Sequence, residues 1–411
     1  MKALADVRPL RESAVFRRLW LGTTASGFGG QMSAFAMLYY LYDTTGSAAT
    51  VGLAGLAAGV PMIVIALAGS AFLDHVDRRR LALACTGVQI VTTAGMAAVA
   101  FGGGGGVAAM LALLAVSASC GALGAPARRT FLPAILSGER LAAGLALSHL
   151  SFQLAMLTGP ALAGLLTAAA GVAWCFVVDT ATFAAALAGI RGVPGGVAPG
   201  GGRPGAAAVT QGIRYAVSTP AVRGALLADL AATLLAMPVA LFPVLNAERF
   251  GGRPEVLGLF TSALAVGGVA ASVLSGLASH RRRAGIVMLA SGAVWALTLG
   301  LAGLVTALPL VLALIAVAGA ADTWAVVARG TVLQSATTEA YRGRVAALEH
   351  VVGVGGPELG NLRAGLIASV TSAGASLALG GAAALLATVL LAFSMPGLRR
   401  FRTPSDAGTP R

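Results

Sequence analysis

Long apolar stretches alternate with short polar gaps along almost the whole chain. Each stretch is about as long as the ~20 residues that an α-helix needs to span ~30 Å of hydrocarbon. The pattern predicts twelve membrane-spanning helices, at residues 16–41, 49–73, 81–101, 107–130, 141–168, 172–191, 221–246, 255–279, 285–305, 308–331, 344–370 and 374–396. The fold class expected is therefore an all-α integral membrane protein with both chain ends on one side of the bilayer.

The composition agrees with this reading. Charged residues make up 10% of the chain and the mean hydropathy is +0.86, whereas soluble domains carry ~25% charged residues. Of the 28 lysines and arginines, 24 lie in the termini or in every second gap, and only Arg249 and Arg253 lie in the other gaps. Because Lys-rich and Arg-rich loops stay in the cytoplasm, both termini are predicted to be cytoplasmic. The Arg, Ala and Gly bias suggests a GC-rich bacterial genome.

Several classes of function are disfavoured. The net charge of +13 is spread over loops that anionic lipid headgroups would contact, so nucleic-acid binding is not expected. Lys2 is the only lysine, so the chain has no P-loop for ATP hydrolysis. The histidines lack metal-binding spacing. We expect no enzyme activity, no cofactor and no metal; the expected partners are a small-molecule substrate, protons and the lipid bilayer, and the chain is expected to be a monomer.

A Gly/Pro-rich segment at residues 192–205 divides the predicted helices into six and six. Such a segment cannot hold a helix and is typical of a flexible linker. A short amphipathic stretch around 206–218 follows it and is expected on the membrane surface. The predicted domains are an N-terminal bundle at 1–191, a cytoplasmic linker at 192–220, a C-terminal bundle at 221–398 and a cytoplasmic tail at 399–411.

The two halves repeat each other. A shift of 201 residues, without gaps, superimposes three informative pairs: Arg128 on Arg329, Thr130 on Thr331, and His149 on His350. For the histidines, a buried, hydrogen-bonded imidazole is the default expectation, and a proton-relay role is the alternative. Parallel repeats of six helices, with the substrate between the halves, are the architecture of major facilitator transporters. The repeat therefore predicts two pseudo-symmetric six-helix bundles.

Four of the acids inside predicted spans are candidate sites, because a charge there costs at least ~2.5–3.5 kcal/mol and often marks a functional site. They are Asp322, Glu358, Asp229 and Asp179. Carboxyl groups in a partly dry cavity can take up and release protons near neutral pH, as a proton-coupled carrier requires. The alternative is that each acid pairs with an arginine and fixes helix packing.

Two arginines also fall within predicted spans or at their ends. Arg363 is expected close to the external interface, where it either snorkels toward water or binds an anionic substrate. Arg329 is expected to snorkel at the cytoplasmic end of its helix.

The loop LDHVDRRR at residues 73–80 is a candidate gate. Its Asp74 and Asp77, followed by Arg78 and Arg79, can form interhelical salt bridges and interact with helix ends. Bridges of this kind can hold one side of a carrier shut in one state and break in the other.

The fifth predicted span contains GPALAG, with Gly159, Pro160 and Gly164 as its main features. Small residues at four-residue spacing permit close helix approach, and proline bends the helix axis.

These motifs resemble those of major facilitators, and within them the subgroup of the enterobactin exporter and related bacterial efflux proteins. The segments that carry the resemblance are FRRLWLG, DHVDRRR, PARRTFLPA, GPALAG, LLADL, DTWAVVARGTVLQ, YRGRV and ELGNLRAGLIA. The resemblance implies a proton-driven inner-membrane exporter of a siderophore-like or drug-like molecule, with GPALAG similar to the antiporter motif of drug exporters. The loop departs from the usual pattern at Ser70 and His75, where Gly and Arg are more common.

The function predicted is proton-coupled efflux of a small amphipathic molecule by alternating access. An importer or uniporter of the same fold is an alternative, because no residue alone sets the direction. A non-transporting membrane receptor and an intramembrane enzyme are further alternatives, although the loops are short for a catalytic pocket.

Overall fold

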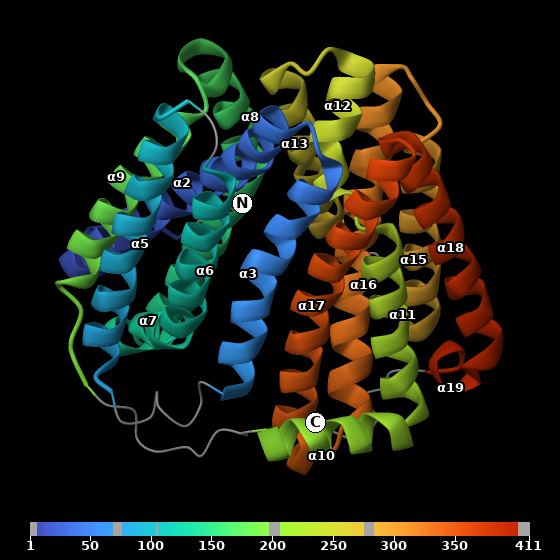
Figure 1. The fold of residues 1–411 in the computed structure, drawn as a ribbon. Coiled ribbons are helices and arrows are strands. Elements are labelled where there is room, and N and C mark those ends of the chain that lie inside the picture. The colour runs from blue at the N-terminus through green and yellow to red at the C-terminus, as the bar shows by residue number, and fades with distance from the viewer. Residues whose placement is uncertain (1–5, 69–75, 104–105, 197–205, 275–282, 402–411) are drawn as a thin grey trace. The chain divides into compact units, whose positions relative to one another are not determined.

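The computed structural model describes residues 6–68, 76–103, 106–196, 206–274 and 283–401, which contain helices and no β-strand. Figure 1 shows the long helices: α2 (Ala14–Thr45), α3 (Ala48–Ala68), α5 (Arg78–Phe101), α6 (Val107–Arg129), α8 (Gly138–Ala170), α9 (Ala173–Ile190), α11 (Pro220–Ala236), α13 (Pro254–Val273), α15 (Ala284–Ala302), α16 (Leu308–Ala336), α17 (Arg342–Val370) and α18 (Ala373–Ser394). The short ones are α1 (Arg8–Glu12), α7 (Phe131–Ile135), α10 (Ala206–Ser218), η1 (Val239–Leu241), α12 (Phe242–Phe250), η2 (Glu339–Tyr341) and α19 (Pro396–Arg399). Each of the twelve predicted spans overlaps one long helix.

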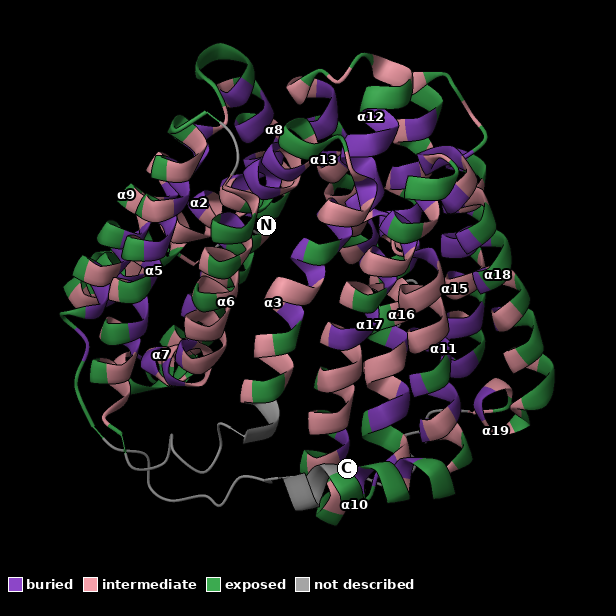
Figure 2. Cartoon of the chain, viewed as in Figure 1, coloured by how far each residue is buried: buried purple, intermediate pink, exposed green. Residues whose placement is uncertain are grey.

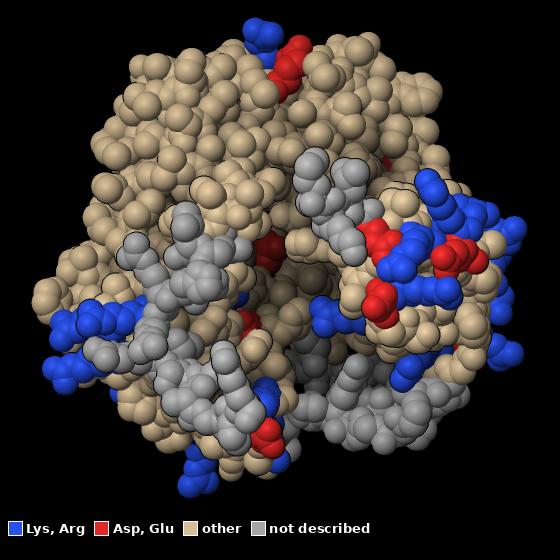
Figure 3. All heavy atoms as spheres, turned by 180° about the vertical axis from the view of Figure 1, so that it is seen from behind, with Lys and Arg blue, Asp and Glu red and all other residues tan. Residues whose placement is uncertain are grey.

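Within the described residues, ten helical segments are long and apolar enough to cross a membrane. The two long helices outside this group are α2 and α17, in which Gly, Ser and charged residues interrupt the apolar positions. Figure 3 shows a broad area without charged side chains on one face of the molecule. The chain is a multi-pass, all-α membrane protein, as predicted.

The predicted span at 221–246 is wrong as a single helix. The helix α11 ends at Ala236, Met237 is extended, and the chain resumes as η1 and α12. Pro238 disfavours the helical conformation of the residue before it, and Pro243 lacks the N–H that a continuing helix would need.

The described chain packs as two compact units. One comprises Met1–Gly46, Ala57–Arg203 and Arg253–Ser262, and the other comprises Ser47–Leu56, Pro204–Gly252 and Ala263–Arg411. The first turns of α3 thus belong with the C-terminal helices, and the first turns of α13 with the N-terminal ones. The predicted linker boundary stays a prediction, since residues 197–205 lie outside the described part.

Small residues bring the helices of each unit into close contact, and Figure 2 shows the buried positions of the helices in purple. In the N-terminal unit, a methyl group added at Gly22 would lie 2.7 Å from the Ala185 carbonyl, and one at Gly189 would lie 2.7 Å from the Arg18 carbonyl. These contacts join α2 to α9. Without a hydrophobic force between helices in lipid, such backbone proximity supplies the packing energy.

The amphipathic segment predicted around 206–218 is the helix α10, which packs on the start of α17. The Tyr215 hydroxyl donates to the Ala336 carbonyl at 3.3 Å and accepts from the Thr338 N–H at 3.2 Å. The Thr338 N–H lowers the pKa of Tyr215. The Tyr215 ring stacks on Tyr341 with 4.5 Å between centroids, so α10 is fixed to the turn between α16 and α17.

The repeat-matched His149 and His350 are both exposed. The expectation of buried imidazoles is therefore wrong.

Candidate functional site

Three charged side chains meet in the core of the C-terminal unit. The Nη1 of Arg329 on α16 contacts Oδ1 of Asp229 on α11, and its Nε donates to Oε1 of Glu349 on α17 at 3.2 Å. The side chains are 13%, 9% and 30% exposed, respectively. The snorkelling expectation for Arg329 is wrong, because its guanidinium forms ion pairs with two carboxylates on neighbouring helices. Sequence reasoning missed Glu349, although an acid inside a predicted span was the available signal.

Asp229 also lines a small cavity. Its Oδ2 is buried and has no hydrogen-bond donor among the described residues. The cavity has a volume of about 20 Å³, and Asp322, Trp295 and Thr388 also line it. The Nε1 of Trp295 is likewise buried without a described acceptor. A space of this size, with a donor and an acceptor in its walls, matches about one water molecule.

Asp322 lies midway along α16, seven residues before Arg329, which places it ~10 Å away along the helix axis. Its side chain is exposed, although the position is central in the helix. The structure thus brings Asp229 and Asp322, two of the four predicted acids, to the walls of one small cavity.

Glu358 and Arg363 lie elsewhere, at the break between α11 and η1. Arg363 donates from Nε to the Leu234 carbonyl at 2.9 Å and from Nη2 to the Leu235 carbonyl at 2.5 Å. These carbonyls end α11 and have no intrahelical partner. Arg363 therefore acts as a C-terminal cap for the broken helix.

The same turn of α17 also binds the chain on the C-terminal side of the break, in η1. The Asn361 side-chain oxygen accepts from the Ala240 N–H at 3.1 Å. The amide of Asn361 is hydrogen-bonded to the Glu358 carboxylate, and Gly55 leaves the room for that carboxylate. Although Pro357 lies inside α17, the helix continues without a break.

Asp179 is buried in the interface between α2 and α9. Its partners are hydroxyl groups, those of Ser33 and Thr182, and no salt bridge to it occurs within the described residues. Gly29 faces it, and a methyl group there would collide with Thr182. The contact is tight, so Asp179 has little room to move.

The loop before α5 is tied to the end of α9. The Asp77 side chain caps α5 by accepting from the Arg80 N–H at 2.9 Å, and this hydrogen bond lowers the pKa of Asp77. The Arg78 N–H donates to the Gly196 carbonyl at 3.2 Å, and Arg79 donates to the Arg191 carbonyl. Asp74 lies outside the described residues. Where the loop is described, its partners are backbone groups and not opposite charges.

The GPALAG segment lies at two close helix contacts of the N-terminal unit. A methyl group at Gly159 would lie 2.7 Å from Cβ of Gln31 on α2, and one at Gly164 would lie 2.6 Å from the Pro254 carbonyl. A methyl group at Gly258 on α13 would lie 2.7 Å from the Pro160 carbonyl. The segment thus joins α8 to both α2 and the start of α13.

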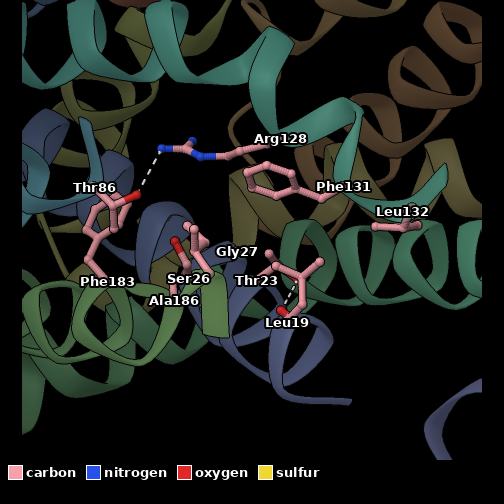
Figure 4. Close-up of a pocket in the computed structure, with 11 residues that line it drawn as sticks. Leu19, Thr23, Ser26, Gly27, Thr86, Arg128, Phe131, Leu132, Phe183 and Ala186 are labelled. Atoms are coloured by element: carbon pink, nitrogen blue, oxygen red, sulfur yellow. Dashed lines mark hydrogen bonds between the residues drawn. The ribbon is translucent and has the colours of Figure 1, made fainter. Parts of the chain in front are cut away.

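A larger cavity lies within the N-terminal unit, and Arg128 lines it (Figure 4). Its volume is about 260 Å³. The walls are mainly apolar, with hydroxyl groups from α2 and α5. The residues that line it are Leu19, Thr23, Ser26, Gly27, Thr86, Arg128, Phe131, Leu132, Phe183, Ala186 and Ile190.

The fold and these sites can be compared with known proteins. The sequence profile of the family described as transmembrane secretion effector, a family of major facilitators, matches residues 4–407. The chain belongs to this family. It is a major facilitator transporter and not an enzyme.

Curated relatives include the enterobactin exporter EntS of Shigella boydii serotype 18 and that of Escherichia coli O139:H28. Each is 26% identical over 400 residues, which cover 97% of this chain and 96% of the relative. Among solved structures, a bacterial homologue of the iron transporter ferroportin has a TM-score of 0.73 at 17% identity, with 95% of this chain and 100% of that chain covered. The nucleoside transporter NupG has a TM-score of 0.73 at 13% identity, with the same coverage. These structures support the fold alone.

Proposed function

We propose that this transporter exports a small amphipathic molecule, siderophore-like or drug-like, from the cytoplasm of a bacterium in exchange for protons. It works as a monomer in the inner membrane, with both termini cytoplasmic. The observation that carries the proton coupling is the ion pair between Arg329 and the buried Asp229, which lines a cavity together with Asp322. The similarity to enterobactin exporters supports the direction and the substrate class.

The cluster provides a physical mechanism for coupling. When Asp229 is charged, Arg329 binds it and ties α11 to α16. A proton that Asp322 takes up and passes through the cavity to Asp229 neutralises half of this ion pair, so Arg329 turns to Glu349. Because the pair joins two helices, its protonation biases the helix packing and with it the access of the substrate.

Glu358 and Asp179 are assigned supporting roles in this proposal. Glu358 takes up a proton near the break in α11, where Asn361 and Arg363 respond to its charge. Asp179 provides a second site in the N-terminal unit. The loop with Asp74, Asp77, Arg78 and Arg79 acts as the cytoplasmic gate, and the contacts of GPALAG keep α8 packed as the carrier changes state.

The substitution Asp322→Asn tests the proposal. An Escherichia coli strain that lacks its own enterobactin exporter would express the chain, and enterobactin in the medium would be measured with and without a protonophore. Export should depend on the chain and collapse with the protonophore. Asp322→Asn should lower it at least about tenfold, since an amide cannot exchange a proton, while the protein still inserts.

Asp43→Asn is the matched control, because it makes the same chemical change at an exposed end of α2. It should export like the wild type. Export that resists the protonophore, or an Asp322→Asn variant that exports normally, would overturn the proton coupling. Export of ethidium without export of enterobactin would overturn only the siderophore-like substrate.

A further inference from the structure

Arg128 and Arg329 occupy equivalent positions in the two halves, yet their surroundings differ. Arg329 is neutralised by two carboxylates. Arg128 donates from Nη2 to the Gln89 side-chain oxygen at 2.8 Å and to the Thr86 hydroxyl at 3.4 Å. Both partners are neutral, and no carboxylate pairs with Arg128 within the described residues. In the repeat register, Ser148 stands where the other half has Glu349.

The arrangement around Arg128 holds the guanidinium in one place. Thr86 and Gln89 are only 1% and 6% exposed, so their hydrogen bonds hold Nη2 in a fixed, buried position. Gly124, one turn earlier on α6, leaves the space for the side chain, because a methyl group there would lie 3.1 Å from Nη2. The Nε and Nη1 groups have no acceptor among the described residues, and an arginine offers five N–H donors in a planar fork.

The cavity beside this guanidinium suits an anion with an apolar body. Figure 4 shows Arg128 and Phe131 reaching in from one side and Ser26 and Phe183 from the other. The volume of about 260 Å³ lies just below the ~300–1,000 Å³ of pockets for drug-sized ligands. It therefore takes a small molecule, or one group of a larger one. A charge that is otherwise uncompensated in a membrane protein makes an anionic occupant favourable.

We propose that this cavity is a binding site for small apolar anions, with the oxyanion on the free N–H groups of Arg128 and the apolar body between Phe131 and Phe183. The proposal goes beyond export, because binding here does not require transport. The same chemistry is available from a dissolved organic acid and from an anionic lipid headgroup, so the experiment separates these two sources.

Benzoate is the probe, and benzamide is its neutral counterpart of the same shape. The full chain would be placed in nanodiscs of phosphatidylcholine, and the binding of radiolabelled benzoate would be measured by equilibrium dialysis. Saturable binding is expected, with benzamide a poor competitor. Arg128→Gln should weaken the binding at least about tenfold, since it removes a charge-assisted hydrogen bond. Arg129→Gln is the matched control at the adjacent, exposed position and should change the affinity less than twofold.

A second measurement needs no variant. Phenylglyoxal modifies arginines, and peptide mass spectrometry would report the rate at Arg128 and at Arg129 in the same sample. Benzoate should protect Arg128 and not Arg129, and benzamide should protect neither. This arm decides the question if Arg128→Gln does not fold.

Nanodiscs that contain phosphatidylglycerol separate the two sources. Competition between this lipid and benzoate would identify the occupant as a lipid headgroup, whereas unchanged benzoate affinity would identify a dissolved acid. The proposal is overturned if benzoate does not bind saturably, if benzamide competes equally well, or if Arg128 and Arg129 respond alike in both measurements.

Discussion

At the residue scale, Arg329 shows what the sequence could and could not predict. The repeat identified Arg329 as the partner of Arg128, and hydropathy identified Asp229 as an acid within a span. Neither signal predicted that the two meet, because the contact joins residues 100 positions apart through the packing of α11 on α16. Glu349 was missed for the same reason, since only the packing of α17 makes it a partner.

The ion pair leads to a prediction on stability. Arg329→Gln leaves both Asp229 and Glu349 without their cation, so we expect a loss of ~3–5 kcal/mol, the cost of breaking a buried pair from one side. Asp229→Asn should cost less, because Arg329 keeps Glu349. The double variant should recover part of the loss, since it buries no unpaired charge at this contact. Thermal denaturation of the purified variants would measure all three.

The outcome that contradicts this prediction is additivity. If the losses of the two single variants simply add in the double variant, the side chains are not coupled, and the short contact has no energetic consequence.

At the scale of elements, the sequence contained part of the signal for the break after α11. Met237-Pro238 and Pro243 were visible in the sequence, but the high hydropathy of residues 221–246 favoured one continuous span. The residues that stabilise the break, Asn361 and Arg363, lie over 120 positions away on α17. The sequence predicted a proton site at Glu358 and either snorkelling or anion binding for Arg363, because the partner of this turn of α17 could not be inferred from the local pattern.

Arg363 caps α11 in the structure, and binding of an anionic substrate is its other predicted role. Measurements of protein stability separate the two roles. If it caps α11, Arg363→Ala frees the Leu234 and Leu235 carbonyls and should destabilise the protein by about 2–4 kcal/mol, since hydrogen bonds to charged groups contribute ~1.5–3 kcal/mol each. Arg363→Lys should lose about half as much, because an ammonium group does not reproduce the planar fork. Denaturation without any substrate is the measurement. A wild-type melting curve for Arg363→Ala, with export lost, would instead assign Arg363 to the substrate.

At the scale of the whole molecule, the membrane spans were the most predictable feature, since hydrocarbon thickness fixes the length and apolarity of each helix. The grouping of helix ends was not predictable. Ser47–Leu56 packs with the C-terminal unit and Arg253–Ser262 with the N-terminal one, through backbone contacts at Gly52 and Gly258. In a chain with 56 glycines, a glycine by itself does not predict a close contact of this kind.

The predicted orientation of the chain in the membrane is inferred from the distribution of its basic residues. The structure explains one exception to this distribution. Arg249, in a gap predicted to be external, donates to the Gly303 and Val305 carbonyls at 2.6 and 2.7 Å. It caps the end of α15, so its position reflects helix capping and not topology. With Arg249 set aside, Arg253 is the one basic residue that the sequence places in a predicted external gap.

Reporter fusions would test this orientation. Green fluorescent protein at the C-terminus should fluoresce, because it folds in the cytoplasm, and alkaline phosphatase after Gly252 should be active, because it requires the oxidising exterior. Arg249→Gln should leave both signals unchanged while it lowers the melting temperature, since it removes the cap and not a topological signal. An active phosphatase at the C-terminus would reverse the predicted topology. The proposed direction of export would then have to be reassigned.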